Sequence, residues 1–453
     1  MVILLLSTYE LGRQPFGLAS PAAWLREAGF EVRAGDLSRE RLAGLPVEDA
    51  ALVALFLPMH TATRLALPVV DHVRARNPRA VLAAYGVYAP LSAAQLRAHG
   101  VHAILGGEFE ADLVELARRV ARGDVPAAGD PVGDRPGQVP RLTFRVPDRS
   151  GLPPLSRYAS LQMPDGSRRI AGCTEASRGC RHLCRHCPIV PVYNGRFRIV
   201  PVDVVMADVA AQVEAGAQHI TFGDPDFFNG PRHAMRVVES LAARFPGLTY
   251  DVTIKIEHLL RHRALVPTLR QTGCVFVTSA VESVDDEVLG LLRKGHTRAD
   301  VAEVVGIMRA ARLPLAPTFV AFTPWTTLDG YLDLLTFIAA HDLVESVAPI
   351  QLAIRLLLPA GSALLEVPEV AALAGPLDAT SLVHPWRHPD ARVDGLQARI
   401  QALVGRNLHA PRADVFAEAY ELAAEAAGRG RTRPAPPRTA RVTVPYLTEP
   451  WYC

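Results

Sequence analysis

The first 122 residues alternate short apolar runs with longer amphipathic stretches, and this pattern constrains the fold more than any other feature of the sequence. The apolar runs predict strands at 2–6, 31–34, 52–57, 80–84 and 103–105, and helices are predicted to begin near Leu18, Thr61, Leu91 and Glu108. Strands that alternate with helices at this spacing form βαβ units and pair in parallel. We therefore predict an N-terminal α/β domain over 1–122, with a doubly wound parallel sheet of the flavodoxin-like or Rossmann type.

The alternation resumes near Ile170, after a stretch rich in proline and glycine that predicts a linker over 123–168. Strands are predicted at 170–173, 219–223, 250–254, 275–279, 316–321 and 349–355, with helices between them. A complete barrel of eight such units takes about 250 residues. The six units here are too few to close one, so we predict a partial (β/α)6 barrel over 169–360. A helical region over 361–430 and an Arg/Pro-rich tail over 431–453 follow.

Both kinds of parallel sheet bind ligands beyond the carboxyl ends of their strands. At that edge of the N-terminal sheet, the segments "LPMHT", "YGVYAP" and "GGEFE" follow predicted strands. They make His60, Gly86, Tyr88 and Gly107 candidate contacts for a cofactor. A lone histidine that begins a helix, such as His60, is more often a cap or a surface residue.

Composition excludes several classes of protein. Forty-eight basic and 46 acidic residues give a net charge of +2, which argues against a nucleic-acid coat or a membrane-surface protein. No apolar run approaches the roughly 18 residues that a membrane helix needs. Six cysteines in 453 residues, three of them clustered, do not form a secreted disulfide framework. We expect a cytoplasmic protein without nucleic-acid or membrane partners.

The clustered cysteines are Cys180, Cys184 and Cys187, spaced C-x3-C-x2-C within "EASRGCRHLCRHCPI". With nearby histidines they could bind zinc, but closed zinc sites usually need a second, distant pair of ligands. No such pair is found, because Cys173 and Cys274 stand alone. A redox dithiol leaves the third cysteine without a role. A [4Fe–4S] cluster is ordinarily held by four thiolates. Three would leave one iron open to a ligand that chelates through an amine and a carboxylate, and so the cluster explains the number three.

A C-x3-C-x2-C motif after the first strand of a six-unit barrel resembles the radical S-adenosylmethionine (SAM) enzymes. The resemblance implies that Cys180, Cys184 and Cys187 ligate a [4Fe–4S] cluster whose open iron binds SAM. The reduced cluster then cleaves SAM to a 5′-deoxyadenosyl radical, and the electron comes from a donor such as a flavodoxin or ferredoxin. His186 holds the place of an aromatic residue that usually packs near the adenine.

The same resemblance implies SAM contacts at later strand ends. Those candidates lie in "FGDPDFFNG", "TIKIEH" and "TSAVES", and they are Gly223, Asp224, Asp226, Lys255, Glu282 and Ser283. Each alone has an ordinary structural explanation. An aspartate at a strand end is more often a helix cap, and a pair such as Lys255 and Glu257 is usually a solvated salt bridge. Their recurrence on one barrel face favours a binding site.

A doubly wound domain ahead of such a barrel resembles the cobalamin-binding subclass of the family. The chain has no D-x-H-x-x-G motif, which supplies the lower-axial histidine in one cobalamin group. Relatives that lack the motif hold cobalamin without it. The resemblance leaves open whether this domain binds cobalamin or only shapes the substrate pocket.

Several stretches, "STYELGRQPFGLASP" among them, also resemble a bacterial radical SAM group named for a C-terminal CUAEP or CCAEP tail. Here Tyr446, Leu447 and Thr448 replace the Cys–Sec–Ala or Cys–Cys–Ala portion, so the paired chalcogens are lost, and Glu449 and Pro450 remain. Only the terminal Cys453 could substitute for the lost pair. An ordinary tail thiol is the simpler interpretation.

These resemblances predict C-methylation of a small-molecule or peptide substrate, with methylcobalamin as the methyl donor. One alternative is cobalamin-free transfer of a SAM-derived group to a soft element such as arsenic or selenium. Methylthio transfer is less favoured, because no second cysteine cluster exists to hold an auxiliary site. The alternative from another class is a non-catalytic regulator that binds zinc or an iron–sulfur cluster.

Overall fold

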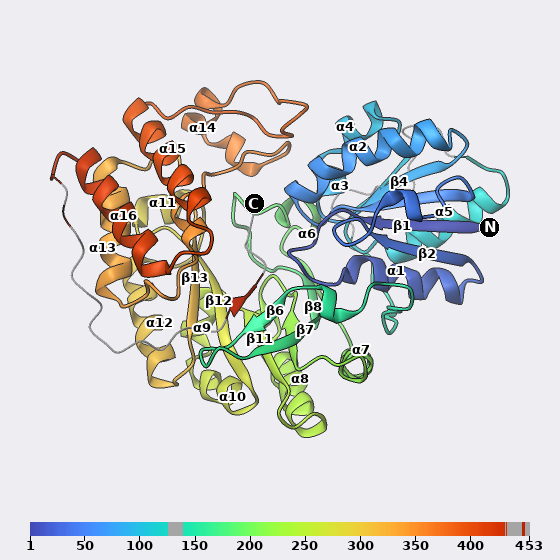
Figure 1. The fold of residues 1–453 in the computed structure, drawn as a ribbon, viewed down its shortest axis with the longest axis horizontal. Helices are drawn as coiled ribbons and strands as arrows, with labels where there is room; N and C mark the ends of the chain where they lie inside the picture. The colour runs from blue at the N-terminus through green and yellow to red at the C-terminus, as the bar shows by residue number, and fades with distance from the viewer. Residues whose placement is uncertain (126–138, 431, 433–445, 449–453) are drawn as a thin grey trace.

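The computed structural model describes residues 1–125, 139–430, 432 and 446–448, and its N-terminal part is built on a five-stranded parallel sheet. The strand order is β2-β1-β3-β4-β5, which is the flavodoxin-like order. The strands are β1 (Val2–Ser7), β2 (Glu31–Asp36), β3 (Ala50–Phe56), β4 (Val81–Tyr85) and β5 (Ala103–Leu105). The predicted doubly wound sheet is therefore confirmed (Figure 1).

Helices cover both faces of this sheet, which explains why its strands are apolar throughout. Ile3 and Leu5 of β1 pack with α1 (Phe16–Glu27) and α5 (Glu110–Ala121). Leu4 and Leu6 point to the opposite face, because side chains alternate along a strand. The second face is covered by α2 (His60–Arg76), α3 (Tyr88–Leu91) and α4 (Ala93–Ala98).

The second sheet has seven strands in the order β13-β12-β11-β10-β7-β6-β14. Five of them run in parallel, namely β7 (Arg168–Thr174), β10 (His219–Phe222), β11 (Thr249–Thr253), β12 (Cys274–Glu282) and β13 (Leu315–Phe319). Two short antiparallel strands extend the edge beyond β7, namely β6 (Ser160–Gln162) and β14 (Tyr446–Leu447). The last of these pairs residues that are far apart in the sequence.

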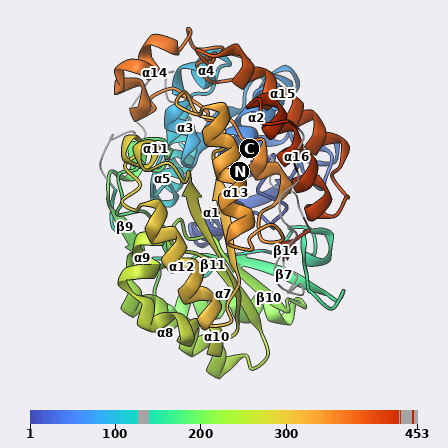
Figure 2. The same cartoon turned by 90° about the vertical axis from the view of Figure 1, so that its left-hand side faces the viewer.

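Helices follow the parallel strands along the outside of this sheet, as a partial barrel requires (Figure 2). They are α7 (Val202–Glu214), α8 (Pro231–Arg244), α9 (Ile256–Arg261), α10 (Val266–Gln271), α11 (Asp286–Leu291), α12 (Arg298–Ala310) and α13 (Leu328–Ala340). The partial barrel is confirmed, but its sixth strand is reduced to one parallel bridge between Phe322 and Arg355. The start of the predicted strand at 349–355 forms a 3-10 turn, η5 (Pro349–Leu352). Proline has no N–H to donate to a strand ladder, so Pro349 disfavours pairing there.

The region after Gly361 includes α14 (Pro368–Leu373), α15 (Ala391–Arg406) and α16 (Arg412–Ala426). Helix α16 packs against α13 and α15, and Ile400 and Leu403 of α15 belong to the same buried core as the barrel strands. Leu382 packs instead into the core of the N-terminal domain. The C-terminal region therefore contacts both sheets.

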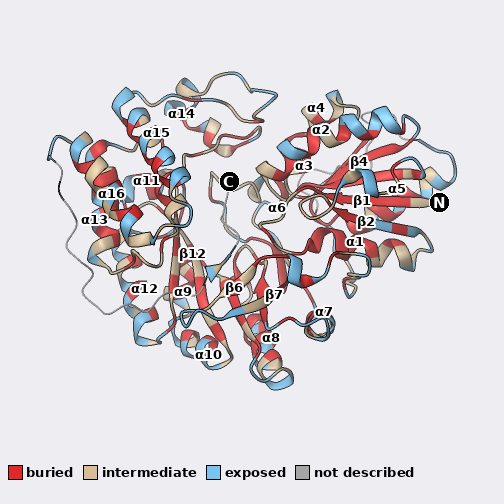
Figure 3. Ribbon diagram, viewed as in Figure 1, coloured by how far each residue is buried: buried red, intermediate tan, exposed pale blue. Residues whose placement is uncertain are grey.

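The strands of both sheets are predominantly buried, and exposed residues concentrate on the outer helices and loops (Figure 3). Each sheet thus has its apolar faces covered, and only the strand ends and their loops are free to build a site. Among the described residues, no helix combines the length and the apolar character needed to cross a bilayer.

Candidate active site

A cavity of about 750 Å³ lies between the carboxyl ends of the two parallel sheets. Loops that follow β1, β3, β4 and β5 line one side, and the mouth of the barrel lines the other. Six of the predicted site residues line it, namely Gly86, Tyr88, Gly107, His186, Gly223 and Glu282. The other eight lie outside the lining, namely Cys180, Cys184, Cys187, His60, Asp224, Asp226, Lys255 and Ser283. The two sheet edges therefore share one cavity.

The three clustered cysteines lie on a loop between β8 (Ser177–Gly179) and the short helix α6 (Val190–Tyr193). Cys180 and Cys184 are buried and Cys187 is half-buried, and all three are free thiols. Burial raises the pKa of Cys180 to about 12 and that of Cys187 to about 11. Without a cation these sulfurs would remain protonated at neutral pH. A metal centre would convert them to thiolates, since coordination deprotonates a thiol outright.

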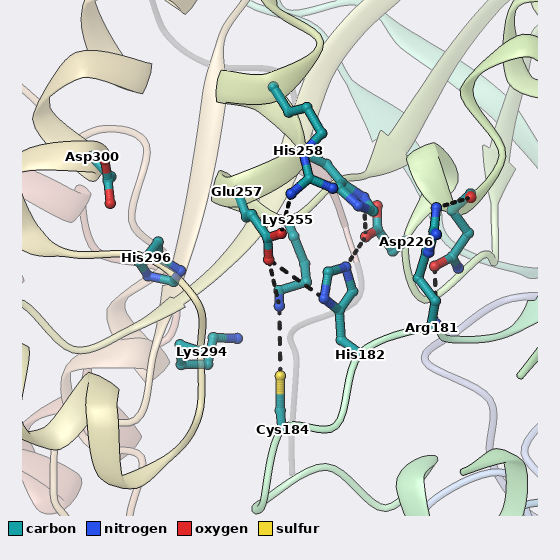
Figure 4. A network of polar contacts seen from close by, with 12 residues as sticks. Arg181, His182, Cys184, Asp226, Lys255, Glu257, His258, Lys294, His296 and Asp300 are labelled. Atoms are coloured by element: carbon teal, nitrogen blue, oxygen red, sulfur yellow. Dashed lines mark hydrogen bonds and ion pairs between the residues drawn. The ribbon is translucent and has the colours of Figure 1, made fainter. Parts of the chain in front are cut away.

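Two buried lysines supply positive charge to this loop (Figure 4). Lys255, directly after β11, donates to Cys184 Sγ at 3.7 Å. Burial alone would lower the pKa of Lys294, but the attraction of Glu282 and of the Cys184 sulfur raises it above its ordinary value. Three thiols on one loop, with ammonium groups beside them, fit the donor set of a [4Fe–4S] cluster that carries thiolate charge.

Glu282 connects the fourth parallel barrel strand to the cysteine loop. It ends β12 at a register shift and adopts a positive φ of 70°, which turns its side chain toward the loop. Its carboxylate accepts from Lys294 Nζ at 3.3 Å and lies 3.1 Å from His186 Nε2. Burial would raise the pKa of Glu282, but Lys294 and His186 outweigh it and hold the pKa at about 2. An anionic carboxylate therefore faces the cavity beside the cysteine loop.

Asp224 points away from the cavity, toward the turn between β7 and β8. It accepts hydrogen bonds from Ala176 N at 2.9 Å and from Ser177 Oγ at 2.5 Å. Burial raises its pKa to about 7 even though these hydrogen bonds lower it. Both carboxylate oxygens are engaged within the protein, so Asp224 holds the start of the cysteine loop in place. Its neighbour Gly223 is the residue of this strand end that lines the cavity.

Asp226 likewise turns away from the cavity. One of its oxygens caps the 3-10 turn η3 (Phe227–Asn229) by accepting from Phe228 N at 3.1 Å. The other lies near His182 and His258, which together lower the pKa of Asp226 to about 2 against the opposing effect of burial. These two histidines were not predicted as site residues.

Two further candidates have structural partners. Ser283 Oγ accepts from Asp285 N at the start of α11. His60 Nε2 lies 2.6 Å from the carbonyl oxygen of Ser381, so this histidine joins α2 to the C-terminal region.

Comparison with known proteins agrees with this geometry. Residues 174–327, which include the cysteine loop and strands β10 to β13, match the radical SAM superfamily. The chain contains a radical SAM domain. Such a domain implies SAM and a [4Fe–4S] cluster, and the three thiols described above fit the cluster.

Similarity extends beyond the radical SAM domain. The hopanoid C-3 methylase of Methylococcus capsulatus is 25% identical over 325 residues, which cover 69% of this chain but only 62% of that relative. The cobalamin-dependent radical SAM enzyme OxsB superposes with a TM-score of 0.72 at 14% identity, covering 90% of this chain and 67% of OxsB. The methyltransferase TsrM from Kitasatospora setae gives 0.64 at 18% identity, covering 82% and 76% of the two chains. The two-sheet architecture is thus shared with both solved enzymes.

Arg178, just before the first cysteine, fastens the radical SAM domain to the N-terminal sheet. Its guanidinium lies 2.7 Å from Glu110, 3.2 Å from Glu108 and 2.7 Å from Glu175. Burial raises the pKa of Glu108 to about 7, and Arg178 only partly offsets this effect. The role of Arg178 could not be predicted from the sequence, because its partners come from a segment about 70 residues away and from a neighbouring turn.

The N-terminal face of the cavity is lined mainly by apolar side chains and glycine. Phe56, Met59 and Phe109 lie there with Gly86 and Gly107. No histidine from the N-terminal sheet appears in the lining of this cavity. This face therefore suits cobalamin held by shape and backbone contacts, and it offers no imidazole ligand for cobalt.

Two charged residues interrupt this face. Glu10 and Arg13 of the β1–α1 loop both line the cavity. Burial, with repulsion from Glu175, raises the pKa of Glu10 to about 8 although Arg13 lowers it.

Proposed function

We propose that this chain is a radical SAM methyltransferase that cleaves SAM reductively and methylates a carbon atom of a small molecule or peptide. The observation that supports this most directly is one cavity shared by His186 of the cysteine loop, its partner Glu282 and the carboxyl edge of the N-terminal sheet. A substrate in that cavity would contact both faces at once, so that a SAM-derived radical could take a hydrogen atom from a substrate carbon and methylcobalamin could then give that carbon a methyl group.

In this proposal Cys180, Cys184 and Cys187 hold the cluster, and Lys255 and Lys294 stabilise its thiolates. A bound [4Fe–4S] cluster supplies the electron that cleaves SAM to methionine and a 5′-deoxyadenosyl radical. A small electron-transfer protein such as a flavodoxin or ferredoxin would provide that electron.

We assign the contacts to SAM to residues that border the barrel mouth. Gly223 and Glu282 line the cavity, and Ser283 follows Glu282 directly in sequence. We assign the methionine amine to Glu282, because a carboxylate with a pKa of about 2 stays anionic at neutral pH. His186 borders the same cavity and is assigned to the adenine. Asp224 and Asp226 act as positioning residues.

Cobalamin is assigned to the N-terminal face, with Gly86, Tyr88 and Gly107 as its contacts. The assignment is supported by the solved structures of OxsB with aqua-cobalamin bound and of TsrM with cobalamin and a [4Fe–4S] cluster bound. His60 is engaged with Ser381 and is not assigned to cobalt.

The test compares wild type with Cys184→Ala after anaerobic reconstitution with iron, sulfide and cobalamin. With SAM and dithionite, we expect wild type to release 5′-deoxyadenosine and Cys184→Ala to release at least about 100-fold less, because a cluster lacking one thiolate loses its redox role. The control is Cys274→Ala, which removes a buried thiol of β12 that has no place in the cysteine loop.

Metal analysis of the same samples separates the alternatives. About four irons per chain with cobalt support the complete proposal. Four irons and 5′-deoxyadenosine without cobalt would instead favour cobalamin-free transfer to a soft element such as arsenic or selenium. Zinc bound through sulfur, without iron, would overturn the proposal that the chain is a radical SAM enzyme and would favour the alternative of a zinc-binding regulator.

A further inference from the structure

A second group of metal-ligating side chains lies behind the cysteine loop, outside the cavity lining. It consists of His182 from the loop, Asp226 after β10 and His258 of α9. Asp226 and His258 are almost fully buried, at 0% and 1% exposure of their side chains, and His182 is 14% exposed. Figure 4 shows the three side chains pointing toward one another from three different segments.

Three atoms of this group converge without forming aligned hydrogen bonds. His258 Nδ1 lies 2.7 Å and His182 Nε2 lies 3.3 Å from Asp226 Oδ2. Within the described part of the chain, none of the three atoms has a hydrogen-bond partner of acceptable geometry. Short contacts with poor alignment are expected when lone pairs are aimed at a common point rather than at one another. A buried carboxylate oxygen without a partner is otherwise costly.

The remaining atoms of the group are already held in place. The second oxygen of Asp226 accepts from Phe228 N, which leaves Oδ2 free to act as a ligand. The other nitrogen of His182, Nδ1, lies 3.5 Å from Glu257 Oε2. A carboxylate behind a metal-bound histidine fixes its tautomer and ring orientation in many zinc sites. Glu257 is in turn close to Lys255 and Arg261, which hold its carboxylate in this orientation.

We propose that His182 Nε2, Asp226 Oδ2 and His258 Nδ1 bind a zinc ion. Two imidazoles and one carboxylate form a three-ligand set that zinc commonly accepts, with one position left for water. The ion ties the cysteine loop to the carboxyl ends of β10 and β11, and it offsets the negative charge of Asp226. The inference does not depend on the proposed function, since none of its ligands is a cluster cysteine.

The test measures zinc and iron in protein reconstituted anaerobically with its cluster and then desalted. We expect about one zinc per chain in wild type and at most about a tenth of that in His258→Gln, because removing one of three protein ligands weakens binding strongly. The matched control is His262→Gln. Its ring lies 5.8 Å from the ring of His258 but does not belong to the group, so zinc should be unchanged.

X-ray absorption at the zinc edge identifies the ligands. We expect nitrogen and oxygen scatterers at about 2.0–2.1 Å and no sulfur at about 2.3 Å. Wild type with about four irons and no zinc would overturn this inference and leave the proposed function intact. Zinc with sulfur scatterers would place it on the cysteines and overturn the cluster assignment as well. Should His258→Gln fail to fold, Asp226→Asn replaces it, since the amide preserves the size of the side chain.

Discussion

The two faces of the cavity differ in the side chains that line them. At the barrel mouth, buried charges lie in close pairs, as in Lys294 with Glu282 and Lys255 beside Cys184. The N-terminal face presents aromatic rings and glycines such as Gly86 and Gly107. Paired charges hold small ionic groups at defined points, whereas an apolar face with few side chains accepts a broad ligand. The contrast fits a barrel face that orients the reacting groups and an N-terminal face that offers a broad contact surface to a large ligand.

The largest effect is expected when the ion pairs that connect the two faces are removed. Arg178→Met leaves the buried Glu108 and Glu110 and the partly buried Glu175 without their cation. We expect a loss of about 4 kcal/mol in the free energy of unfolding, because removing one partner leaves buried charge uncompensated. Urea denaturation followed by circular dichroism measures it.

Arg399→Met is the matched control for Arg178→Met. It removes an exposed pair with Glu425 and should change stability by no more than about 1 kcal/mol. Equal effects of the two substitutions would show that the ion pairs of Arg178 stabilise the protein no more than an exposed ion pair does.

The next largest effect is expected at the barrel mouth. Lys294→Met leaves Glu282 without its ammonium partner and with only His186 beside its carboxylate, and it should cost about 3 kcal/mol. The double variant Lys294→Met/Glu282→Gln should recover part of this loss, since it removes both charges. A double-mutant cycle from urea midpoints measures the coupling. A coupling energy near zero would show that Lys294 and Glu282 contribute to stability independently of each other.

On the N-terminal face, the sharpest prediction concerns backbone geometry. Gly86 has a φ of +107°, and a Cβ there would lie 2.8 Å from the carbonyl oxygen of Leu57. Gly86→Ala should therefore cost about 2 kcal/mol. It should also weaken cobalamin binding, followed by the absorbance of the bound cofactor.

Gly306→Ala provides the control for Gly86→Ala. Gly306 lies within α12 with open space around its Cα, so alanine should stabilise the protein by up to about 1 kcal/mol. Similar losses in both variants would contradict the geometric explanation.

The smallest expected effect is the pH dependence due to Glu10. With its pKa raised from 4.5 to about 8, this carboxyl is protonated in the folded protein where the unfolded chain has already ionised it. Folding then takes up a proton, so stability falls as pH rises between these two values. Glu10→Gln should remove this slope, and over the single pH unit from about pH 7 to about pH 8 its stability relative to wild type should rise by about 1 kcal/mol. Thermal unfolding at both pH values tests it, and identical slopes would contradict the buried state of Glu10.

Much of the fold was predictable because its signals are local. The continuous apolar run of β1 indicates a strand buried on both faces, and the strand–helix alternation indicates parallel sheets. The sixth barrel strand was the main error, since Pro349 interrupts pairing that the apolar pattern alone suggested. The pairing of β14 with β6 could not be foreseen, because no local pattern links segments so far apart.

The candidate site was likewise predictable only where its signals are local. C-x3-C-x2-C places Cys180, Cys184 and Cys187 on one loop whatever the rest of the chain does, and so the sequence by itself determined the thiol set. The direction of each charged side chain was decided by tertiary structure. Asp224 and Asp226 follow the same strand as Gly223 but turn to Ser177 and to two histidines. Those partners come from other segments, and the direction of a buried carboxylate is set by what the packed chain brings within reach, which is a hydrogen-bond donor for Asp224 and the proposed metal site for Asp226.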